Sequence, residues 1–356
     1  MMINKITGEA CKATRSLWEE VFYEDSVQFT DYYFQNKAGK NIGYVIGEAP
    51  YDAMMFRTPY QLHIGNQQRE ISYLVGVATR EVCRHRGYMR SLLMHSFKEM
   101  YEEKQPFTFL MPANPAIYEP FDFRYIYERD MWKLKDGIEI EGLYRVSDLQ
   151  EQFPDISILW MLADFANEYL KEHCNIYVHR DVEYYEMQMK ELAAQNGDIY
   201  VLFEQSKIKA FFLYAKEEGE VFIQEVVGEE GDIPDFLQRE ETKKPIIMAR
   251  IIHLEEMLKL VCSKEHRKLT IEIEDDLIPE NTGTYDWEIT PNGSKVTKIQ
   301  KDSECVDLKA AGSEYEALNE KYEANGKMEG IMQRFSMHIR ELAPYILRNV
   351  FINEIV

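Results

Sequence analysis

The sequence predicts an α+β fold with more than one domain, and three observations support this class. First, 356 residues are too many for one small mixed domain and favour two or three domains. Second, a β-branched apolar stretch, a glycine-containing turn and a helical repeat follow one another between residues 70 and 100. Third, helices followed by an antiparallel meander occur twice along the chain. Together these patterns indicate mixed sheets covered by helices.

In chain order, the first domain is predicted to span residues 1–140. Residues 8–34 have a helical repeat with apolar side chains on one face and acidic ones on the other, which is typical of a helix that faces solvent on one side. Strand-like stretches then complete a mixed sheet: residues 41–46, 54–56 and 70–79. The chain becomes charged and loop-like between Trp132 and Gly142, where we expect the domain to end.

A basic turn after the strand-like stretch 71–79 has the properties of an anion site. Gly87 lies between this strand and a predicted helix. The first turn of a helix has backbone N–H groups without internal partners and a partial positive charge, so it binds phosphate where no side chain blocks the approach. Arg84, Arg86 and Arg90 add positive charge in a chain that is acidic overall. Taken alone, the pattern fits a solvated basic turn equally well.

A second domain is predicted over residues 141–244, with the layout of the front half of the first. Two helices and three antiparallel strands are expected at residues 158–172, 184–195, 198–204, 207–215 and 221–227. No basic glycine loop follows the last of these strands, and the acidic segment 228–232 would repel a pyrophosphate. We therefore expect a domain of similar shape without a phosphate site.

Residues 245–356 are predicted to form a smaller α+β domain. A helix, three strands and two further helices are expected at residues 254–262, 268–274, 283–290, 295–299, 313–322 and 330–342. The segment from Val350 to Val356 is too apolar for an exposed tail, so we expect it to pack against the rest of the protein.

Composition limits the classes of partner. Acidic residues exceed basic ones by 62 − 41, a formal net charge of −21, which disfavours nucleic acid and anionic membranes and suits cationic small molecules, although such a charge also serves solubility. The five cysteines are scattered and odd in number, so neither a metal site nor a disulfide framework is expected. No stretch approaches the ~18 apolar residues of a membrane span, and no apolar leader opens the sequence. A soluble, cytoplasmic protein is therefore expected.

Two segments together carry a family resemblance. Residues 84–89 read Arg-His-Arg-Gly-Tyr-Met, and Tyr118 precedes Phe123 by five residues. These segments resemble the Arg/Gln-x-x-Gly-x-Gly/Ala pyrophosphate loop and the Tyr-x-x-x-Gly-Phe segment of the GNAT acetyltransferase superfamily. Met89 departs from the first pattern and Asp122 from the second, where an aspartate tolerates the positive φ that glycine adopts freely.

The loop and the following segment also resemble one subfamily. Residues 84–90 read Arg-His-Arg-Gly-Tyr-Met-Arg and residues 117–121 read Ile-Tyr-Glu-Pro-Phe. Both are similar to segments of the Eis-like (enhanced intracellular survival) proteins. This resemblance implies two GNAT-like mixed-sheet domains, the second degenerate, followed by a sterol-carrier-protein-like α+β domain whose C-terminus reaches the active site. It also implies a homo-oligomer built on trimers, such as a hexamer.

The resemblance further implies an acetyl-CoA site and a set of functional residues. Tyr118 would be the general acid, and the C-terminal carboxylate of Val356 the general base, with Glu354 as the alternative. Acetyl-CoA would contact Val77, Ala78, Thr79, His85, Arg86, Gly87, Tyr88, Met89, Arg90, Ala113 and Asn114. The acceptor pocket would include Trp18, Phe22, Asp25, Phe29, Tyr33 and Glu354.

The chemistry of acetyl transfer adds two expectations. A bulge in the strand, compatible with Gly76, would expose a backbone N–H to the thioester carbonyl near Val77 or Thr79. A carboxylate accepts a proton from an ammonium only where desolvation raises its pKa, as a dry apolar pocket does.

Two function classes follow from these patterns. The first is an N-acetyltransferase that moves the acetyl group of acetyl-CoA to a primary amine of a small cation, such as an aminoglycoside, a polyamine or a lysine, by direct attack. The second is a non-enzymatic binding protein with a vestigial loop and an apolar ligand in the carrier-like third domain.

Overall fold

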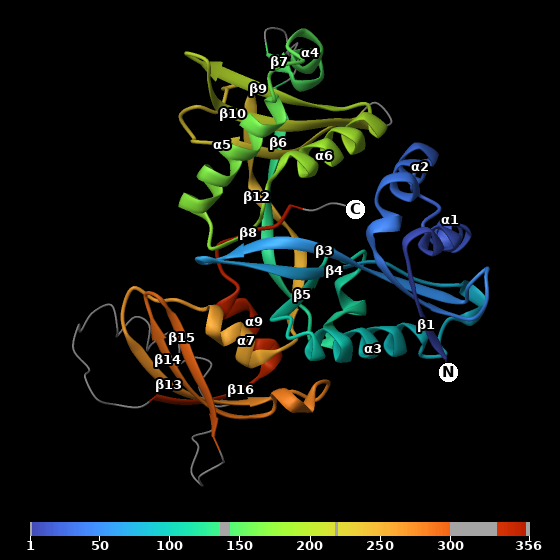
Figure 1. Cartoon of the computed structure of the whole chain (residues 1–356), viewed down its shortest axis with the longest axis vertical. Helices are drawn as coiled ribbons and strands as arrows, with labels where there is room; N and C mark the ends of the chain where they lie inside the picture. The colour runs from blue at the N-terminus through green and yellow to red at the C-terminus, as the bar shows by residue number, and fades with distance from the viewer. Residues whose placement is uncertain (1, 136–142, 218–219, 300–332, 354–356) are drawn as a thin grey trace.

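The computed structural model describes residues 2–135, 143–217, 220–299 and 333–353 (Figure 1). Within these ranges the strands form three sheets, each of which belongs to a different lobe of the molecule. The predicted helix at 313–322 and the predicted base residues Glu354 and Val356 lie outside the described residues.

The largest sheet has nine strands in the described ranges, in the order β1-β2-β3-β4-β5-β12-β6; in addition, β8 pairs with β3, and β17 pairs with β8. All neighbours on the main path are antiparallel except β4 and β5, which are parallel, so the sheet is mixed as predicted. Its strands are β1 Ile3–Thr7, β2 Ile42–Ile46, β3 Ala53–Ile64, β4 Gln67–Thr79, β5 Phe107–Leu110, β6 Arg124–Leu134, β8 Ile176–Val178, β12 Leu237–Ile251 and β17 Val350–Phe351.

Helices cover both faces of this sheet (Figure 1). On one face lies α3 Tyr88–Glu102, whose buried residues Leu92, Leu93 and Phe97 follow the helical repeat. Burial of each such side chain stabilises the fold by about 1.5–3 kcal/mol. The other face carries the short helices η1 Gly8–Thr14, α1 Arg15–Val21 and α2 Val27–Asn36, which divide the predicted helical region into pieces. No helix in the described ranges has the length and apolarity needed to cross a bilayer.

The second lobe contains a sheet of order β11-β10-β9-β7, with three helices. Its predicted helices and strands are confirmed within a few residues. The elements are β7 Tyr144–Arg145, α4 Val146–Gln152, α5 Ile158–His173, α6 Val182–Ala194, β9 Asp198–Glu204, β10 Lys207–Glu217 and β11 Glu220–Gly228.

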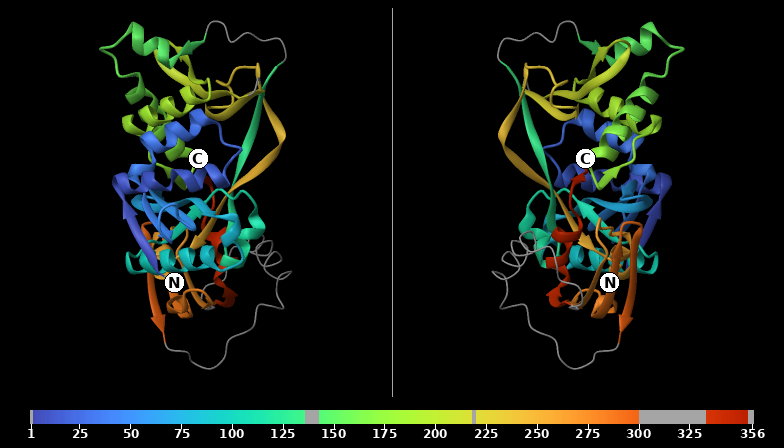
Figure 2. Two further views of the ribbon diagram at one scale, coloured as in Figure 1. Left: turned by 90° about the vertical axis from the view of Figure 1, so that its right-hand side faces the viewer. Right: turned by 90° about the vertical axis from the view of Figure 1, so that its left-hand side faces the viewer.

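This second lobe is inserted between two strands of the first sheet. Strands β6 and β12 pair from Ala249↔Arg124 to Leu237↔Leu134 and together run from the first sheet toward the second lobe (Figure 2). The predicted domain boundary at 244/245 therefore falls inside β12, and residues 245–251 belong to the first sheet rather than to the third domain. The sequence places this apolar run in the third domain because, apart from Leu237, β12 is buried only from Ile246 to Ile251, and the exposed part before it resembles a linker.

The third lobe has a sheet of order β15-β14-β13-β16. The predicted meander is confirmed as β13 Arg267–Glu274, β14 Gly283–Thr290 and β15 Gly293–Ile299, after α7 Leu254–Leu260. The helix predicted at 330–342 is wrong in its first part, because β16 Gln333–His338 pairs with β13 in parallel and only α9 Ile339–Ile346 is helical.

Candidate functional site

Strand β4 contains a bulge at Gly76. The pairing with β3 shifts register between Met54↔Ala78 and Phe56↔Val75, and Gly76 has a φ of +61°. A Cβ at this position would lie 2.8 Å from Cζ3 of Trp18. Both the backbone conformation and the space therefore require glycine, and the predicted bulge is confirmed.

Beyond the bulge, the other edge of β4 pairs with no strand of the described ranges. Its parallel ladder with β5 consists of the single residue pair Tyr73↔Phe109. On its far side, β5 pairs with β12 over four residues. In the described part of the chain, no strand pairs with this edge of β4 between Val75 and Thr79, so its backbone amide groups are available to a ligand.

The turn before α3 has the geometry of an anion site. Gly87 is the N-cap of the helix in the left-handed conformation, with φ +78° and ψ 14°, and a Cβ there would meet nothing within 4 Å. His85 has a left-handed φ as well. The exposed side chains of Arg84 and Arg86 donate to the carbonyls of Thr79 (3.4 Å) and Val82 (3.1 Å), which ties the turn to the end of β4. The start of a 15-residue helix, open space and positive charge thus coincide.

Tyr118 lies in a compact turn after β5. Its carbonyl accepts hydrogen bonds from the N–H groups of Phe121 (2.9 Å) and Phe123 (3.4 Å). The ring packs edge-on against Phe123 with centroids 5.9 Å apart, and only 9% of the residue is exposed. Burial raises the pKa of the Tyr118 phenol to about 12. No described residue hydrogen-bonds its hydroxyl group, which stays protonated at neutral pH.

The structure brings these sequence-predicted residues together. Tyr118, Val77, Tyr88 and Met89 all pack on one cluster of buried side chains beneath α3. The guanidinium of Arg90 lies 5.7 Å from the ring centroid of Phe121, so the first turn of α3 contacts the Tyr118 turn.

The remaining predicted contacts of acetyl-CoA lie in the same region. Asn114 caps the short helix η4 Pro115–Ile117 by accepting from the N–H of Ala116, and Ala113 beside it is exposed. Ala78 is buried and Thr79 half-buried at the end of β4.

The predicted acceptor residues form an aromatic cluster on the opposite face of the sheet. The indole of Trp18 stacks on Tyr33 (4.4 Å), contacts Phe22 (4.7 Å) and donates to Asp25 (2.8 Å). Trp18 and Tyr33 are 3% and 1% exposed, so they form the buried base of this cluster and do not face solvent. Phe22, Asp25 and Phe29 are partly exposed, and burial raises the pKa of the Asp25 carboxyl.

The last described residues pack against the first and second lobes, as expected from their composition. Strand β17 pairs with β8, which in turn pairs with β3. Val350 and Ile352 are 8% and 0% exposed, and both belong to the buried cluster that contains Trp18. The ring of Phe351 lies 5.8 Å from that of Tyr127, and Asn353 donates to the carbonyl of Gln224 (2.6 Å). The tail therefore lies on the sheet face that carries the predicted acceptor residues.

One polar residue near the site was missed at the level of sequence. Arg250 is completely buried in β12 and lies 3.6 Å from Asp122, which closes the Tyr118 turn. Its signal was an arginine in the apolar run 246–252, because such a residue is buried only when it has partners.

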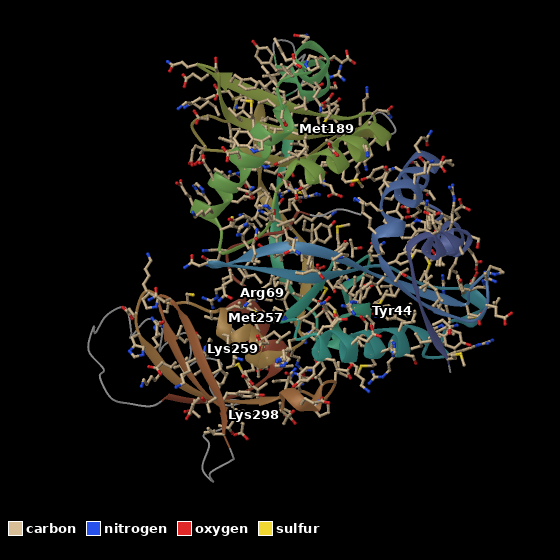
Figure 3. All side chains as sticks on the ribbon, in the orientation of Figure 1. Tyr44, Arg69, Met189, Met257, Lys259 and Lys298 are labelled. Carbon is tan, nitrogen blue, oxygen red and sulfur yellow. The ribbon has the colours of Figure 1, made fainter. Side chains whose placement is uncertain are left out.

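A polar cavity of the described residues lies elsewhere. It has a volume of about 490 Å³ and is found where the β3–β4 hairpin meets the third lobe (Figure 3). Charged and amide side chains dominate its lining, among them Gln67, Arg69, Glu256, Lys259, Glu288 and Lys295. Neither Tyr118 nor the Gly87 turn contributes to it, so we do not assign it to the same site.

Three solved structures share the overall fold at low sequence identity. A GCN5-related N-acetyltransferase from Anabaena variabilis has a TM-score of 0.67, 15% identity and coverage of 100% of both chains. A conserved protein of unknown function from Enterococcus faecalis, described as a probable N-acyltransferase, has a TM-score of 0.68, 16% identity and coverage of 84% of this chain and 85% of its own. Eis1 from Mycobacterium abscessus has a TM-score of 0.64 and 9% identity, with coverage of 98% of this chain and 90% of its own.

Sequence comparison identifies the first lobe. Residues 2–126 match the family model of the acetyltransferase (GNAT) domain, whereas no curated protein sequence matches the chain. The matched range contains the bulge at Gly76, the Gly87 turn and Tyr118. Residues 2–126 are therefore an acetyltransferase domain of the GNAT family, the class of enzymes that takes its acetyl group from acetyl-CoA.

Proposed function

We propose that this protein is an N-acetyltransferase that moves the acetyl group of acetyl-CoA to a primary amine of a small cationic acceptor. The observation that carries the proposal is the combination of an unpaired β4 edge, a left-handed glycine at the start of α3 and a buried, protonated tyrosine around one cluster of side chains. In this proposal, the β4 edge stabilises the carbonyl oxygen of the thioester, the glycine turn holds the donor, and the tyrosine protonates the sulfur.

The donor would lie along β4 and against the start of α3. The backbone N–H groups after Gly87 and the side chains of Arg84, Arg86 and Arg90 would bind the pyrophosphate. The open space around Gly87 supports this fit, since a Cβ there meets no other atom within 4 Å. Bound acetyl-CoA supplies the activated acetyl group.

Each step of the transfer is assigned to a group of this chain. A carboxylate of the C-terminal segment, that of Val356 or of Glu354, would take a proton from the acceptor ammonium. A backbone N–H of Val77 or its neighbours at the bulge would stabilise the negative charge that develops on the carbonyl oxygen. The amine would then attack the carbonyl carbon, and Tyr118 would donate its hydroxyl proton to the departing sulfur as the C–S bond breaks. The proton that the new amide nitrogen loses would restore the phenol. With a pKa of about 12, the Tyr118 phenol first donates a hydrogen bond to the sulfur. Desolvation in the site would also raise the pKa of the coenzyme A thiol, which favours transfer of the proton from the phenol to the sulfur.

The acceptor class follows from charge and from the aromatic cluster. A net charge of −21 attracts cations, and Asp25 and Phe22 are partly exposed on the acceptor face. A screen of aminoglycosides, polyamines and lysine peptides for release of the coenzyme A thiol tests the proposal. We expect at least one class to support turnover above the rate of hydrolysis. Acetyl-CoA binding without turnover on any amine would contradict it.

Substitution of Gly87 by valine should weaken acetyl-CoA binding about tenfold or more, which corresponds to ~1.4 kcal/mol. A β-branched residue is strained at φ +78° and would place methyl groups where the phosphates approach. Isothermal titration measures the affinity.

Gly8 provides the matched control for this substitution. It has a φ of +61° and equally open space around it, so Gly8→Val imposes similar strain away from the proposed site. Equal affinity of the Gly87 and Gly8 variants would show that the turn has no part in binding.

The subfamily and the third lobe belong to the same proposal. Agreement of the fold with Eis1 over 98% of the chain supports an Eis-like arrangement with a degenerate second GNAT-like domain and a sterol-carrier-like third domain. The polar lining of the cavity beside the third lobe gives no support to an apolar ligand there. A trimer-based oligomer is part of the proposal, and a monomeric mass in light scattering would contradict it.

A further inference from the structure

A buried arginine connects the third lobe to the Tyr118 turn. Arg250 is completely buried, and its guanidinium lies 5.1 Å from the ring centroid of Phe97 in α3. One terminal nitrogen donates to Asp275 Oδ1 at 2.8 Å, and the other lies 3.6 Å from Asp122 Oδ2. The arginine therefore has one carboxylate on each side, and each belongs to a different part of the chain.

The carboxylate of Asp275 is held rigidly by the third lobe. Oδ1 accepts from the N–H groups of Leu277 and Ile278, both at 3.0 Å, and Oδ2 accepts from Asn281 at 2.9 Å. Asn281 also accepts from the N–H of Leu254 at the start of α7. A carboxylate with this many donors has one position, so it fixes the arginine that it binds.

Asp122 is the last residue of the turn that begins at Tyr118. It has a left-handed φ of +64° and is 5% exposed. Besides Arg250, two side chains of the C-terminal region face its Oδ1: His338 Nδ1 at 4.0 Å and Arg340 Nη1 at 3.9 Å. Burial raises the pKa of the Asp122 carboxyl, while the neighbouring Arg250 and His338 act in the opposite direction. Glycine would adopt this conformation without strain, but only the aspartate offers a charge to these partners.

We propose that Asp122 is a positioning residue for Tyr118, and that Arg250 and Asp275 fix it to the third lobe. This inference rests on the proposed function, because it concerns the position of the group that would protonate the leaving thiolate. The ring of Tyr118 packs against Phe123, which directly follows Asp122, and backbone hydrogen bonds close the turn between them. The ion pairs of Asp122 therefore set the position of the turn that carries the hydroxyl group. The third lobe thus takes part in catalysis without contacting the substrate.

The kinetic test combines Asp122→Asn with Tyr118→Phe. Asparagine keeps the size and the tolerance of a left-handed φ but removes the charge. We expect kcat to fall about 10- to 100-fold with the KM for acetyl-CoA unchanged, because misplacement of a catalytic group lowers the rate without removing binding contacts. In the Tyr118→Phe background the same change should have almost no further effect.

Asp198→Asn is the matched control. Asp198 is also a buried aspartate paired with an arginine, Arg145, but it lies in the second lobe. Its replacement should lower the melting temperature and leave kcat unchanged. If Asp122→Asn lowered kcat by the same factor in the Tyr118→Phe background as in the wild type, the positioning role of Asp122 would be overturned. A Tyr118→Phe protein with normal turnover would instead refute the acid assignment of the proposed function.

A second measurement tests, without any substrate, whether these ion pairs hold the Tyr118 turn in place. Hydrogen exchange of the peptide that covers residues 115–124 should be faster in Asp122→Asn and in Arg250→Met than in the wild type and in Asp198→Asn. Exchange of the same peptide should also be faster in Asp275→Asn, although Asp275 lies in the third lobe. Unchanged exchange in all three variants would overturn the proposal.

Discussion

Replacement of Tyr118 by phenylalanine is expected to lower kcat by about 10²–10⁴-fold, the usual contribution of a positioned general acid. The residue is 9% exposed, and the hydroxyl group that the change removes forms no hydrogen bond with a described residue. The edge contact with Phe123 is kept, so the melting temperature and the affinity for acetyl-CoA should be unchanged.

The pH dependence adds a sharper criterion. A phenol with a pKa of about 12 stays protonated at lower pH, so Tyr118 gives no alkaline loss of kcat up to about pH 11. Wild type and variant should therefore have profiles of the same shape, displaced vertically. Tyr125→Phe, in which the phenol of a partly buried neighbour in β6 is removed, is the control and should retain activity. Wild-type turnover in Tyr118→Phe would show that this residue has a purely structural role.

The second large effect is expected from displacement of the C-terminal segment. Ile352→Asp places a carboxylate at a completely buried position, which outweighs the ~1.5–3 kcal/mol gained by burial of the isoleucine. The carboxylate proposed as the base would then be displaced together with this segment. We expect kcat to fall by about 10²–10⁴-fold, while titration still shows normal acetyl-CoA binding, because the proposed donor site lies on β4 and α3.

Three further proteins locate the base. Val221→Asp, an equivalent change at an exposed position of β11, should retain activity. Glu354→Gln should be inactive if its side chain is the base, whereas extension of the chain after Val356 should be inactive if the terminal carboxylate is. Full turnover of a folded Ile352→Asp protein would exclude the tail from the reaction.

Local features of the site could be predicted because each depends on neighbouring residues in the sequence. Gly87 followed by a helical repeat indicates a helix start, and Gly76 in a β-branched strand indicates a bulge. Asp122 was expected to tolerate a positive φ and has one. In each case the chain itself restricts the backbone, so a single sequence is sufficient.

Long-range features could not be predicted from the same patterns. The pairing of β12 with β5 and β6 depends on strands that are more than 100 residues apart in sequence, and an apolar run does not specify its partner. Likewise, residues 333–338 form β16 instead of the predicted helix, because they pair with the edge of β13. Arg250 looked anomalous in its run, but its two carboxylate partners become neighbours only after the third lobe has folded.

The insertion of the second lobe ties it to the first at two places. Leu134 and Leu237 are cross-strand partners, so the chain leaves and re-enters the first domain at adjacent positions. The inserted residues also contain β8, which pairs with β3 on one side and with β17 on the other. Exchange of residues 135–236 for a short hairpin turn would therefore keep the pairing of β6 with β12 but remove the strand that joins the C-terminal segment to the sheet. The second lobe is thus a structural part of the first domain as well as an insertion into it.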